Sequence, residues 1–545
     1  MASQPIPAPA GAAPPPSTRP AKLHGRAFYE SIGSPKYIVA PMVDQSEFAW
    51  RMLTRSFLPE SQRSSILAYS PMFHARLFVD SQKYRDSHYQ PTLSTASPIS
   101  TQNHTGLATT DHQQQPYLDG NPKFDRPLFV QFCANDPQAL LSAALLAAPH
   151  CDAVDLNLGC PQGIARKGHY GAFLQEDQAL IHNMIRTLHE GLPVPVTAKI
   201  RILGDREATL AYARNVLDAG ASILTVHGRR RDQKGHLTGT ADWEHIRYLR
   251  DNLPADTVLF ANGNVLQPGD VQRCLDATGA DGVMAAEGNL SDPGIFAAPP
   301  APEGDGAREY WRGRDGRGGW RVDAVMRRYL DIMHRYVLGR EPPARRPLFK
   351  EKGPHGARMT GITAGPNFVG MQPHLFHMLR HLVTRHHDVR DALARSRLGD
   401  ISLTENILDM VERKVAEGLL EHERTGGRSV EDGDDGRNGA YEKGSRGEGA
   451  GPPEAVTDGP DSSVATVKRC KRPWWVVQPI IRPLPAEALA KGAISLSKKD
   501  KQQKGDGGAV KKEEGEEKKN KTEAGEATER LEEKTSFPDS SLVSG

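Results

Sequence analysis

Residues 196–227 read VTAKIRILGDREATLAYARNVLDAGASILTVH and contain the pattern on which the fold prediction rests. A short apolar run is followed by a longer stretch typical of a helix, and then by a second apolar run. The same alternation continues in both directions, from residue 36 to residue 288. It indicates a parallel α/β sheet, because two parallel strands need a crossover connection, which is usually a helix.

Eight such apolar runs occur along this part of the chain. Helix start signals lie between them, such as Asp136-Pro137 before QALLSAALLAA and Asp242 before WEHIRYLRDNL. Eight strands are the number that closes a TIM (β/α)8 barrel, which we predict, with an open doubly wound sheet as the alternative. The runs are residues 37–43 (YIVAPMV), 65–70 (SILAYS), 128–132 (LFVQF), 153–158 (AVDLNL), 196–202 (VTAKIRI), 222–227 (SILTVH), 258–261 (VLFA) and 282–285 (GVMA).

The segments around the predicted barrel, residues 31–300, differ from it in composition. Residues 1–30 are rich in Pro and Ala and are predicted to be a disordered leader, and residues 81–126 are predicted to be an unstructured polar insertion. After a linker rich in Gly, Arg and Asp, three amphipathic patterns predict a small all-α helical domain at 319–425. Residues 426–545 have mixed charge and few aromatic residues, so this tail is predicted to be mostly disordered.

One apolar stretch interrupts the charged tail. Residues 472–485 read RPWWVVQPIIRPLP and include two tryptophans. Such a stretch either docks on the folded part of the chain as a strap, binds a partner, or has no role.

The composition excludes several classes of protein. With 69 Lys and Arg against 67 Asp and Glu, the net charge is +2, so no basic field covers the whole protein. The five cysteines form no CxxC pair and no spacing suited to zinc, which indicates a reduced, intracellular protein without a metal. Every apolar run is shorter than the roughly 20 residues that cross a bilayer. We expect a monomer in the cytoplasm and/or the nucleus, since KRCKRP at 468–473 is consistent with nuclear import.

The predicted helical domain is locally basic although the whole chain is not. Arg and Lys accumulate between residues 327 and 397, with few acidic residues before Asp388. This density favours contact with nucleic-acid phosphates over the alternative of a solvated helix face.

Polar or reactive residues stand at the ends of seven of the eight runs. In a (β/α)8 barrel the carboxyl ends of all strands meet at one rim, where the loops build the active site. We therefore predict a ligand site there. The residues are Pro41, Met42 and Val43 after the first run, Gln131 in the third, Asn157 and Cys160 at the fourth, Lys199 and Arg201 in the fifth, His227 in the sixth, Asn262, Gly263 and Asn264 at the seventh, and Ala286 and Glu287 at the eighth.

The last two runs predict a phosphate site. Glycine-containing turns after them, with a helix start expected at Ser291-Asp292-Pro293, present backbone N–H groups to an anion. The rest of the ligand then lies over the barrel mouth, beside Gln131, Lys199 and the Pro41–Met42 backbone. Flavin mononucleotide (FMN) fits this footprint, and an anionic reduced flavin offsets the cost of burying Lys199. A salt bridge from Lys199 to Asp155 and a Schiff-base lysine are the alternatives.

Cys160 is the candidate reactive thiol. It lies between Gly159 and Pro161 on a tight turn that is expected to expose the thiol to the rim. The nearby basic residues Arg166, Lys167 and His169 favour a catalytic role over a structural one. By contrast, Cys133, Cys151 and Cys274 sit in apolar surroundings typical of core cysteines.

Taken together, several of these strings resemble the tRNA-dihydrouridine synthase family, most nearly its eukaryotic branch that acts on positions 16 and 17 of the D-loop. The most specific is DAVDLNLGCPQGIARKGHYGAFLQ at 152–175. The others are APMVDQSEFAWR at 40–51, LFVQFCANDP at 128–137, TAKIRI at 197–202, LTVHGRRRDQKG at 224–235, FANGNV at 260–265 and VMAAEGNLSDPGIF at 283–296.

The resemblance implies an FMN-bearing TIM barrel followed by a helical tRNA-binding domain. NADPH, or NADH, would reduce the flavin, which would then reduce the C5=C6 bond of uridine, with U16 and U17 as the expected positions. Cys160 resembles the acid that protonates C5 after hydride arrives at C6. The backbone of Pro41, Met42 and Val43 would bracket the flavin, the side chains of Gln131, Lys199 and His227 would contact it, and Asn262, Gly263, Asn264, Ala286 and Glu287 would form the phosphate end. Substrate or tRNA contacts would come from Asn157, Arg166, Lys167, His169 and Arg201.

One departure from the family pattern concerns the phosphate end. Many members outside this branch have Gly-Arg where this chain has Ala286-Glu287. A carboxylate cannot replace an arginine at a phosphate, so we expect backbone N–H groups to bind it and the Glu287 side chain to point away. Two other functions are the alternatives: a barrel flavoprotein that reduces a small molecule, and an RNA-binding protein without turnover.

Overall fold

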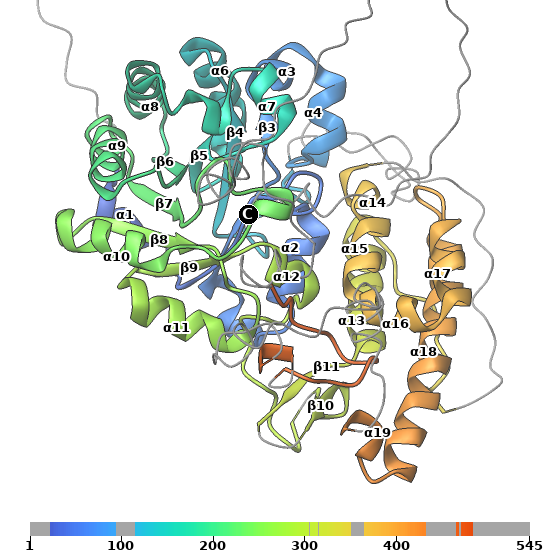
Figure 1. Ribbon diagram of the computed structural model, residues 1–545. Coiled ribbons are helices and arrows are strands. Elements are labelled where there is room, and N and C mark those ends of the chain that lie inside the picture. Colours follow the sequence, from blue (N-terminus) through green and yellow to red (C-terminus); the bar gives the residue numbers. More distant parts are fainter. Residues whose placement is uncertain are drawn as a thin grey trace, which may run out of the picture.

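In the computed structural model of the protein, eight parallel strands close into a barrel (Figure 1). The structure describes residues 22–93, 115–304, 306–313, 316–349, 365–431, 465–467 and 470–482. Strand β1 pairs with β2 and with β9, and β2 also pairs with β4, so the sheet has no open edge among these eight. This closure confirms the predicted TIM barrel. The strands are β1 (Tyr37–Val39), β2 (Ile66–Tyr69), β4 (Leu128–Cys133), β5 (Ala153–Leu158), β6 (Val196–Arg201), β7 (Ile223–His227), β8 (Val258–Asn262) and β9 (Gly282–Ala285), with the two-residue β3 (Phe73–His74) added beside β4.

Helices cover the outside of the barrel (Figure 1). The predicted start signals cap them, since the Asp136 side chain accepts a hydrogen bond from Ala139 N at 2.7 Å, and the Asp242 side chain accepts one from His245 N at 2.8 Å. The helices up to the end of the barrel are α1 (Gly25–Ser31), α2 (Phe48–Arg55), α3 (Ala75–Asp80), α4 (Gln82–His88), α6 (Pro137–Ala147), α7 (Gly163–Lys167), α8 (Gln178–Gly191), α9 (Arg206–Asp218), α10 (Trp243–Asn252), α11 (Pro268–Thr278) and α12 (Glu287–Ser291). Short 3-10 turns are η1 (Glu60–Ser65), η4 (Ala148–His150), η5 (Gly171–Leu174), η6 (Gly235–Leu237) and η7 (Ala307–Glu309).

A helical region follows the barrel, as predicted, and lies beside it (Figure 1). It differs from the prediction in one respect, because the second of the three expected helices is divided into short pieces. Its backbone becomes extended at His386, whose ring packs against Trp474 with the ring centroids 4.6 Å apart. The elements are α13 (Val322–Ile332), which continues as the π-helical turn η8 (Met333–Val337), α14 (Pro366–Val369), α15 (Met371–Met378), α16 (Arg380–Arg385), α17 (His387–Ala394), α18 (Ile401–Arg424) and α19 (Arg428–Glu431).

The predicted leader, residues 1–30, is corrected at its end. Residues 1–21 lie outside the described residues, but α1 begins at Gly25 and buries Phe28 and Tyr29. Phe28 stacks on Phe129 and Tyr29 packs edge-on against Phe260, with centroids 5.9 and 5.8 Å apart. Two aromatic side chains packed on barrel strands explain why this segment folds.

The polar piece at 81–126 is also structured at both ends, in contrast to the expected unstructured insertion, whose middle lies outside the described residues. Asp125 forms ion pairs with Arg51 and Arg55 of α2, both at 2.5 Å, and Asp119 pairs with Arg51 at 2.8 Å. All four side chains are buried. Buried charges need partners, and the end of the polar piece supplies them to α2.

The predicted linker before the helical region contains a small hairpin. Strands β10 (Tyr310–Arg312) and β11 (Gly318–Trp320) pair in antiparallel fashion, and Trp320 is buried against Phe57 of the barrel at a centroid distance of 4.9 Å. The aromatic residues rather than the Gly, Arg and Asp content decide the structure here.

Residues 470–482 lie along this hairpin, and we call them the strap. Val477 N donates to Trp320 O at 2.8 Å and Val322 N donates to Trp475 O at 3.0 Å, while Trp475, Val476 and Val477 are buried. The docking alternative for this stretch is therefore confirmed. The strap, shown at the red end of the colour bar, runs between the barrel and the helical region (Figure 1). The remainder of the predicted disordered tail, residues 426–545, is outside the described residues apart from 426–431 and 465–467.

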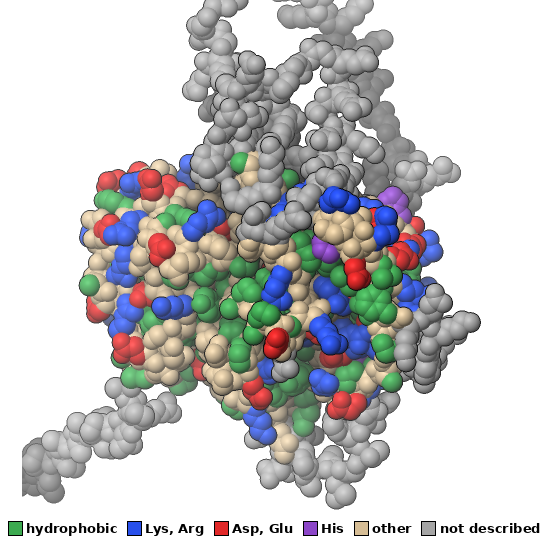
Figure 2. Space-filling view, turned by 90° about the horizontal axis from the view of Figure 1, so that it is seen from below, with side chains coloured by type: hydrophobic (Ala, Val, Ile, Leu, Met, Phe, Trp, Pro, Cys, Tyr) green, Lys and Arg blue, Asp and Glu red, His purple; other side chains and the backbone are tan. Residues whose placement is uncertain are grey.

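Basic and acidic side chains are interspersed on the face of the molecule seen from below (Figure 2). This agrees with the near-neutral net charge. Among the described residues, no helix has the length and apolar character to cross a membrane. The same residues contain no group of three or more His, Cys, Asp or Glu side chains arranged to hold a metal ion.

Candidate functional site

The strand register brings the predicted rim residues next to one another. Asn157 on β5 lies opposite Lys199 on β6, and Arg201 on β6 lies opposite His227 on β7. His227 in turn lies opposite Asn262 on β8. Four neighbouring strands thus present these polar side chains at one edge of the barrel, as expected from the run ends.

A chain of hydrogen bonds connects the polar side chains of β4 and β5. Gln131 Nε2 donates to Asp155 Oδ2 at 2.8 Å, and Asn157 Nδ2 donates to Gln131 Oε1 at 2.8 Å. Thr197 Oγ1 also donates to Asp155, at 2.6 Å. Burial raises the pKa of Asp155 to about 6, although these hydrogen bonds oppose the rise. The expected alternative of a Lys199–Asp155 salt bridge is absent from the described residues, where Asp155 binds the two neutral side chains instead.

The Cys160 turn is built on Asn157. Asn157 Oδ1 accepts hydrogen bonds from Gly159 N at 3.1 Å and from Cys160 N at 2.9 Å, and Arg201 Nε donates to Gly159 O at 2.7 Å. Gly171, at φ +66°, packs so closely that a Cβ there would lie 2.8 Å from Cys160 O. These contacts fix the backbone of the turn from two sides.

The Cys160 side chain differs from the prediction in its exposure. It was expected to be exposed, but it is only 1% exposed and packs in a small cluster with Cys133, Ala165 and Tyr170. Residues 163–171 fold back over the turn as α7 and the start of η5, which accounts for the burial. A reaction partner of this thiol must therefore reach it from the barrel side or displace this cover.

The five residues expected to contact substrate or tRNA fall into two groups. Arg166, Lys167 and His169 are exposed on and after α7. Asn157 and Arg201 are buried, 5% and 4% exposed, and their polar atoms bind the backbone of the Cys160 turn and the Gln131 side chain. The first group is available to a large external ligand, whereas the second shapes the site from within.

The rim contains a buried cluster of basic side chains, which we call the cation cluster: Lys199, Arg201, His227 and Arg229. Burial and the neighbouring Arg201 lower the pKa of Lys199 to about 7. Burial lowers the pKa of Arg201 to about 10, and burial together with nearby arginines lowers that of Arg229 to about 9. The pKa of His227 lies well below its ordinary value because of burial and these same cations.

Burial is the first cause of all these lowered pKa values, because it disfavours the protonated form of each side chain. Repulsion from neighbouring cations adds to it for Lys199, His227 and Arg229. No hydrogen bond or ion pair of Lys199 is found among the described residues. An anionic ligand at the rim relieves this repulsion, so the cluster is suited to bind one.

The end of β8 carries Asn262, Gly263 and Asn264 of the expected phosphate end, and it lies beside His227 at the end of β7 and Arg229 after it. Arg229 donates from Nη2 to Asn264 Oδ1 at 2.6 Å and from Nη1 to His227 Nε2 at 3.1 Å. Gly263 has φ +112°, and a Cβ there would lie 2.6 Å from Ala241 Cβ, so this turn requires glycine. Gly263 and Asn264 therefore follow Asn262, the last residue of β8, as a tight turn beside two of the basic side chains.

The start of the barrel lies against its last strand. Ala40 N donates to Ala285 O at 3.0 Å, which places Pro41, Met42 and Val43 beside Ala286 and Glu287. Pro41 and Met42 are buried and Val43 is half-buried. The residues predicted to bracket a ring system and those predicted at the phosphate end are therefore adjacent across β1 and β9.

One expectation for the end of the barrel is corrected. The helix predicted to start at Ser291 instead ends there, because α12 spans Glu287–Ser291 and the chain turns at Asp292, whose carboxylate accepts a hydrogen bond from Gly294 N at 3.0 Å. The Glu287 carboxylate forms an ion pair with Arg482 of the strap.

Sequence reasoning missed two site residues. Arg229 was visible at the end of the sixth run, in the string His227-Gly228-Arg229, but no role was assigned to it. Arg482 had no local signal, because it is separated from Glu287 by 195 residues.

Many of the basic residues in the helical region have internal partners. Arg345 donates to Glu405 from Nε and Nη2, both at 2.9 Å, and also pairs with Asp331 at 2.5 Å. Arg327 pairs with Glu412, and Arg346 with Asp409. These arginines therefore hold the helices together, while Arg395 and Arg397 remain exposed for external contacts, so the basic composition overstated the surface available to phosphates.

The fold and the site define a barrel protein with a buried cationic rim suited to an anionic ligand. The family described as Dihydrouridine synthase (Dus) matches residues 38–310. A Saccharomyces cerevisiae protein named tRNA-dihydrouridine(16/17) synthase is 47% identical over 373 residues, covering 68% of this chain and 72% of that protein. A Schizosaccharomyces pombe protein of the same name is 41% identical over 471 residues, covering 86% and 94%. A Mus musculus protein named tRNA-dihydrouridine(20a/20b) synthase-like is 34% identical over 263 residues, covering 48% and 68%.

The chain belongs to the dihydrouridine synthase family. The resemblance that the rim strings carry is thereby confirmed.

Proposed function

We propose that this protein is a tRNA-dihydrouridine synthase that reduces the C5=C6 bond of uridines in the D-loop, with U16 and U17 as its positions. The observation that carries the proposal is the cation cluster at the rim of a barrel of this family, next to a buried thiol. The two yeast relatives are named for the 16/17 positions and for NAD(P), which supports the choice of positions and of NADPH or NADH as reductant.

The rim residues fit FMN. His227 Nδ1, Asn262 Oδ1 and Arg482 Nε are buried without a hydrogen-bond partner among the described residues, as expected of atoms that serve a ligand. The cation cluster supplies the positive charge that a phosphate and an anionic flavin need. We propose that Asn262, Gly263, Asn264, Ala286 and the Glu287 backbone form the phosphate end, and that Pro41, Met42, Val43, Gln131, Lys199 and His227 contact the flavin.

When bound, FMN reduced by NADPH supplies hydride to uridine C6. The protein's own task is to hold the base and to deliver a proton to C5, and we assign that proton to the Cys160 thiol. Asn157 and Arg201 fix the turn that carries this thiol. The Cys160 thiol is buried and its backbone is held from two sides. The acid is therefore already oriented when the substrate binds, and this preorganisation raises the rate.

We further propose that exposed basic side chains hold the tRNA. Arg166, Lys167 and His169 lie directly after the Cys160 turn and are exposed, so they can hold the tRNA phosphates near a flipped uridine. Arg395 and Arg397 of the helical region supply more distant phosphate contacts. A location in the cytoplasm and/or the nucleus stays a proposal that rests on the sequence alone.

The test compares the wild-type protein with Cys160→Ala and with the control Cys151→Ala, which removes a buried thiol of the core. The visible flavin spectrum is recorded first, and then dihydrouridine formed on unmodified tRNA with NADPH is measured. We expect all three proteins to retain flavin and only Cys160→Ala to lose activity, by roughly 100-fold or more. Normal turnover by Cys160→Ala would remove the acid role, and absence of flavin from the wild-type protein would remove the cofactor assignment.

A further inference from the structure

The strap is anchored firmly enough to position its last residues. It pairs with β11 through Val477, and the Arg472 side chain, itself buried, donates to Val477 O at 3.1 Å. Gln478 Nε2 donates to Pro473 O and Val476 O at 2.5 and 3.0 Å, which closes the strap into a compact turn. All of these acceptors are backbone carbonyl groups of residues before Arg482. The path of the strap therefore does not depend on the contact that Arg482 makes.

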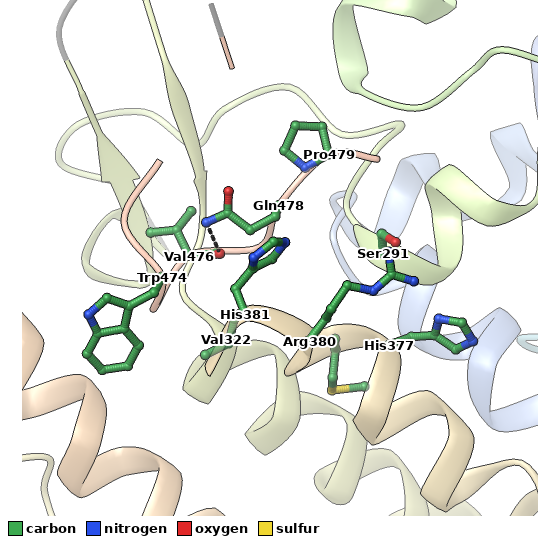
Figure 3. A pocket seen from close by; sticks show the side chains of 10 residues that line it. Ser291, Val322, His377, Arg380, His381, Trp474, Val476, Gln478 and Pro479 are labelled. Carbon is green, nitrogen blue, oxygen red and sulfur yellow. Dashed lines mark hydrogen bonds between the residues drawn. The ribbon is translucent and has the colours of Figure 1, made fainter. Parts of the chain in front are cut away.

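Figure 3 shows how the strap sits between the two parts of the molecule. Trp474, Val476, Gln478 and Pro479 line a cavity of about 10 Å³ together with Ser291 at the end of α12 and with residues of α15 and α16. The cavity has room for about one water molecule. The strap therefore bridges the helical region and α12, which begins at the phosphate end of the rim.

The strap then carries Arg482 to that phosphate end. Its Nη2 binds the Glu287 carboxylate, and its Nε is buried without a hydrogen-bond partner among the described residues. Arg482 is also close enough to Arg229 and His227 to lower the pKa of both. Its guanidinium thus lies among the residues of the cation cluster, although it comes from a segment far along the chain.

Glu287 explains why a guanidinium is needed here. A carboxylate beside a phosphate site repels the phosphate, and Arg482 neutralises it. A guanidinium has five N–H donors in a planar fork, so pairing with one carboxylate oxygen leaves donors for a second anion. The unpartnered Nε is such a donor.

We infer that Arg482 binds the phosphate group of the cofactor, so that the strap completes a cofactor site whose other residues all come from the barrel. This inference rests on the proposed function, since it takes FMN as the ligand. Arg482 would thus supply the positive charge that many family members outside this branch obtain from the arginine of Gly-Arg, which this chain replaces by Ala286-Glu287.

The experiment uses the full chain, freed of flavin, and titrates it with FMN and with riboflavin, which lacks the phosphate. Arg482→Ala is expected to weaken FMN binding roughly 10- to 100-fold, the range for one charge-assisted hydrogen bond, and to leave riboflavin binding unchanged. Arg482→Lys keeps the charge and is expected to recover part of the loss. Glu287→Gln removes a negative charge beside the phosphate and is expected not to weaken FMN binding.

The outcomes separate three cases. If Arg482→Ala weakens FMN and riboflavin equally, or if Glu287→Gln weakens FMN as much as Arg482→Ala does, the ion pair only supports the structure and the inference is wrong. If the wild-type protein binds FMN and Arg482→Ala binds it equally well, the inference is wrong while the proposed function stands. If the wild-type protein binds neither ligand, the proposed function itself fails. Limited proteolysis, with the cleavage sites located by mass spectrometry, reports whether the strap stays docked in each variant.

Discussion

Asn157 accepts a hydrogen bond from the backbone N–H of Cys160 at 2.9 Å, three residues further along the chain. The same side chain donates to Gln131 at 2.8 Å, so it connects the polar chain of β4 and β5 to the turn of the candidate acid. Because its oxygen binds two N–H groups of the turn, we expect Asn157 to act on the reaction mainly by positioning Cys160.

Asn157→Ala is accordingly expected to lower kcat for dihydrouridine formation by roughly 10- to 100-fold while KM for tRNA stays within about twofold. The variant loses the hydrogen bonds that hold the Cys160 turn, but the surface expected to contact tRNA is unchanged. Steady-state kinetics on unmodified tRNA measure both constants. A rise in KM with unchanged kcat would instead show that Asn157 contacts the substrate.

The exposed pair after the Cys160 turn should govern tRNA affinity. Replacing Arg166 and Lys167 together by Ala is expected to weaken tRNA binding and to reduce the slope of log K against log salt by roughly 1 to 2, because each lost phosphate contact removes about 0.7–0.9 from the slope. Filter binding over a range of salt concentrations measures this. Arg186→Ala, which removes an exposed arginine of α8, is the control and is expected to leave the slope unchanged.

The lowered pKa of Lys199, about 7, predicts that FMN binding depends on pH. The negative charge of bound FMN favours the protonated ammonium of Lys199, so affinity is expected to fall as the pH rises above about 7. Because the phosphate is proposed to bind at the other end of the site, the fall should be well below about tenfold per pH unit. The phosphate itself stays dianionic in this range, since its second pKa is about 6. Titrations of the flavin-free protein at several pH values test this, and Lys199→Met should bind more weakly with a flatter profile. An equal slope in Lys199→Met would assign the proton to another group.

The helical region should lose stability in acid through Glu405. Burial acts to raise the pKa of Glu405, but Arg345 and His334 outweigh it and lower the pKa from 4.5 to about 2. A lowered carboxyl pKa in the folded state contributes stability above the ordinary value, and this contribution disappears as the pH falls from 4.5 towards 2. Urea unfolding followed by circular dichroism is expected to show this loss in the wild-type protein and a smaller one in Glu405→Gln. Glu423→Gln, at an exposed position of α18, should behave as the wild type.

The strap should be held mainly by Trp475, which is 2% exposed and packs between Trp311 and His422. Trp475→Ala is expected to destabilise the docked strap by about 3–5 kcal/mol, the usual cost of removing a buried tryptophan, and to open it to proteases. Thermal unfolding and limited proteolysis measure the two effects. The half-buried Trp474 provides the comparison, because Trp474→Ala should cost less. Equal effects of both changes would contradict the packing described here.

The barrel could be predicted from the sequence because each strand carries its own local signal. The apolar runs that became β4, β5 and β7 end at or within one residue of the structural strands, and Asp136 and Asp242 cap the helices that they were expected to start. The rim followed from the same reasoning, since residues at strand ends must meet once the barrel closes. Local sequence patterns therefore suffice to predict the strands and the rim residues, because barrel closure brings the strand ends together.

The rest depended on contacts between distant residues, which composition does not reveal. The polar composition of the residues up to Asp125 predicted no structure there. In the fold, Asp125 pairs with Arg51 and Arg55 of α2, a contact that composition does not indicate. The exposure expected of Cys160 was wrong because residues 163–171 fold back over it, and the helix expected at Ser291 ends where Asp292 caps a turn. No property of residues 480–482 alone indicates that Arg482 reaches Glu287.

The docking of the strap has a consequence for how the chain is made. The ribosome releases the strap after every element that it touches, so α12, α13 and the β10–β11 hairpin must wait for it with their apolar surface uncovered. Trp320, Val322 and Trp311 receive their last covering residues only when the chain has been synthesised beyond residue 477. A gene shortened before this point would still encode all eight barrel strands, but its product would expose these side chains to water and to other molecules. A shortened gene must therefore extend at least through the codon for Arg482.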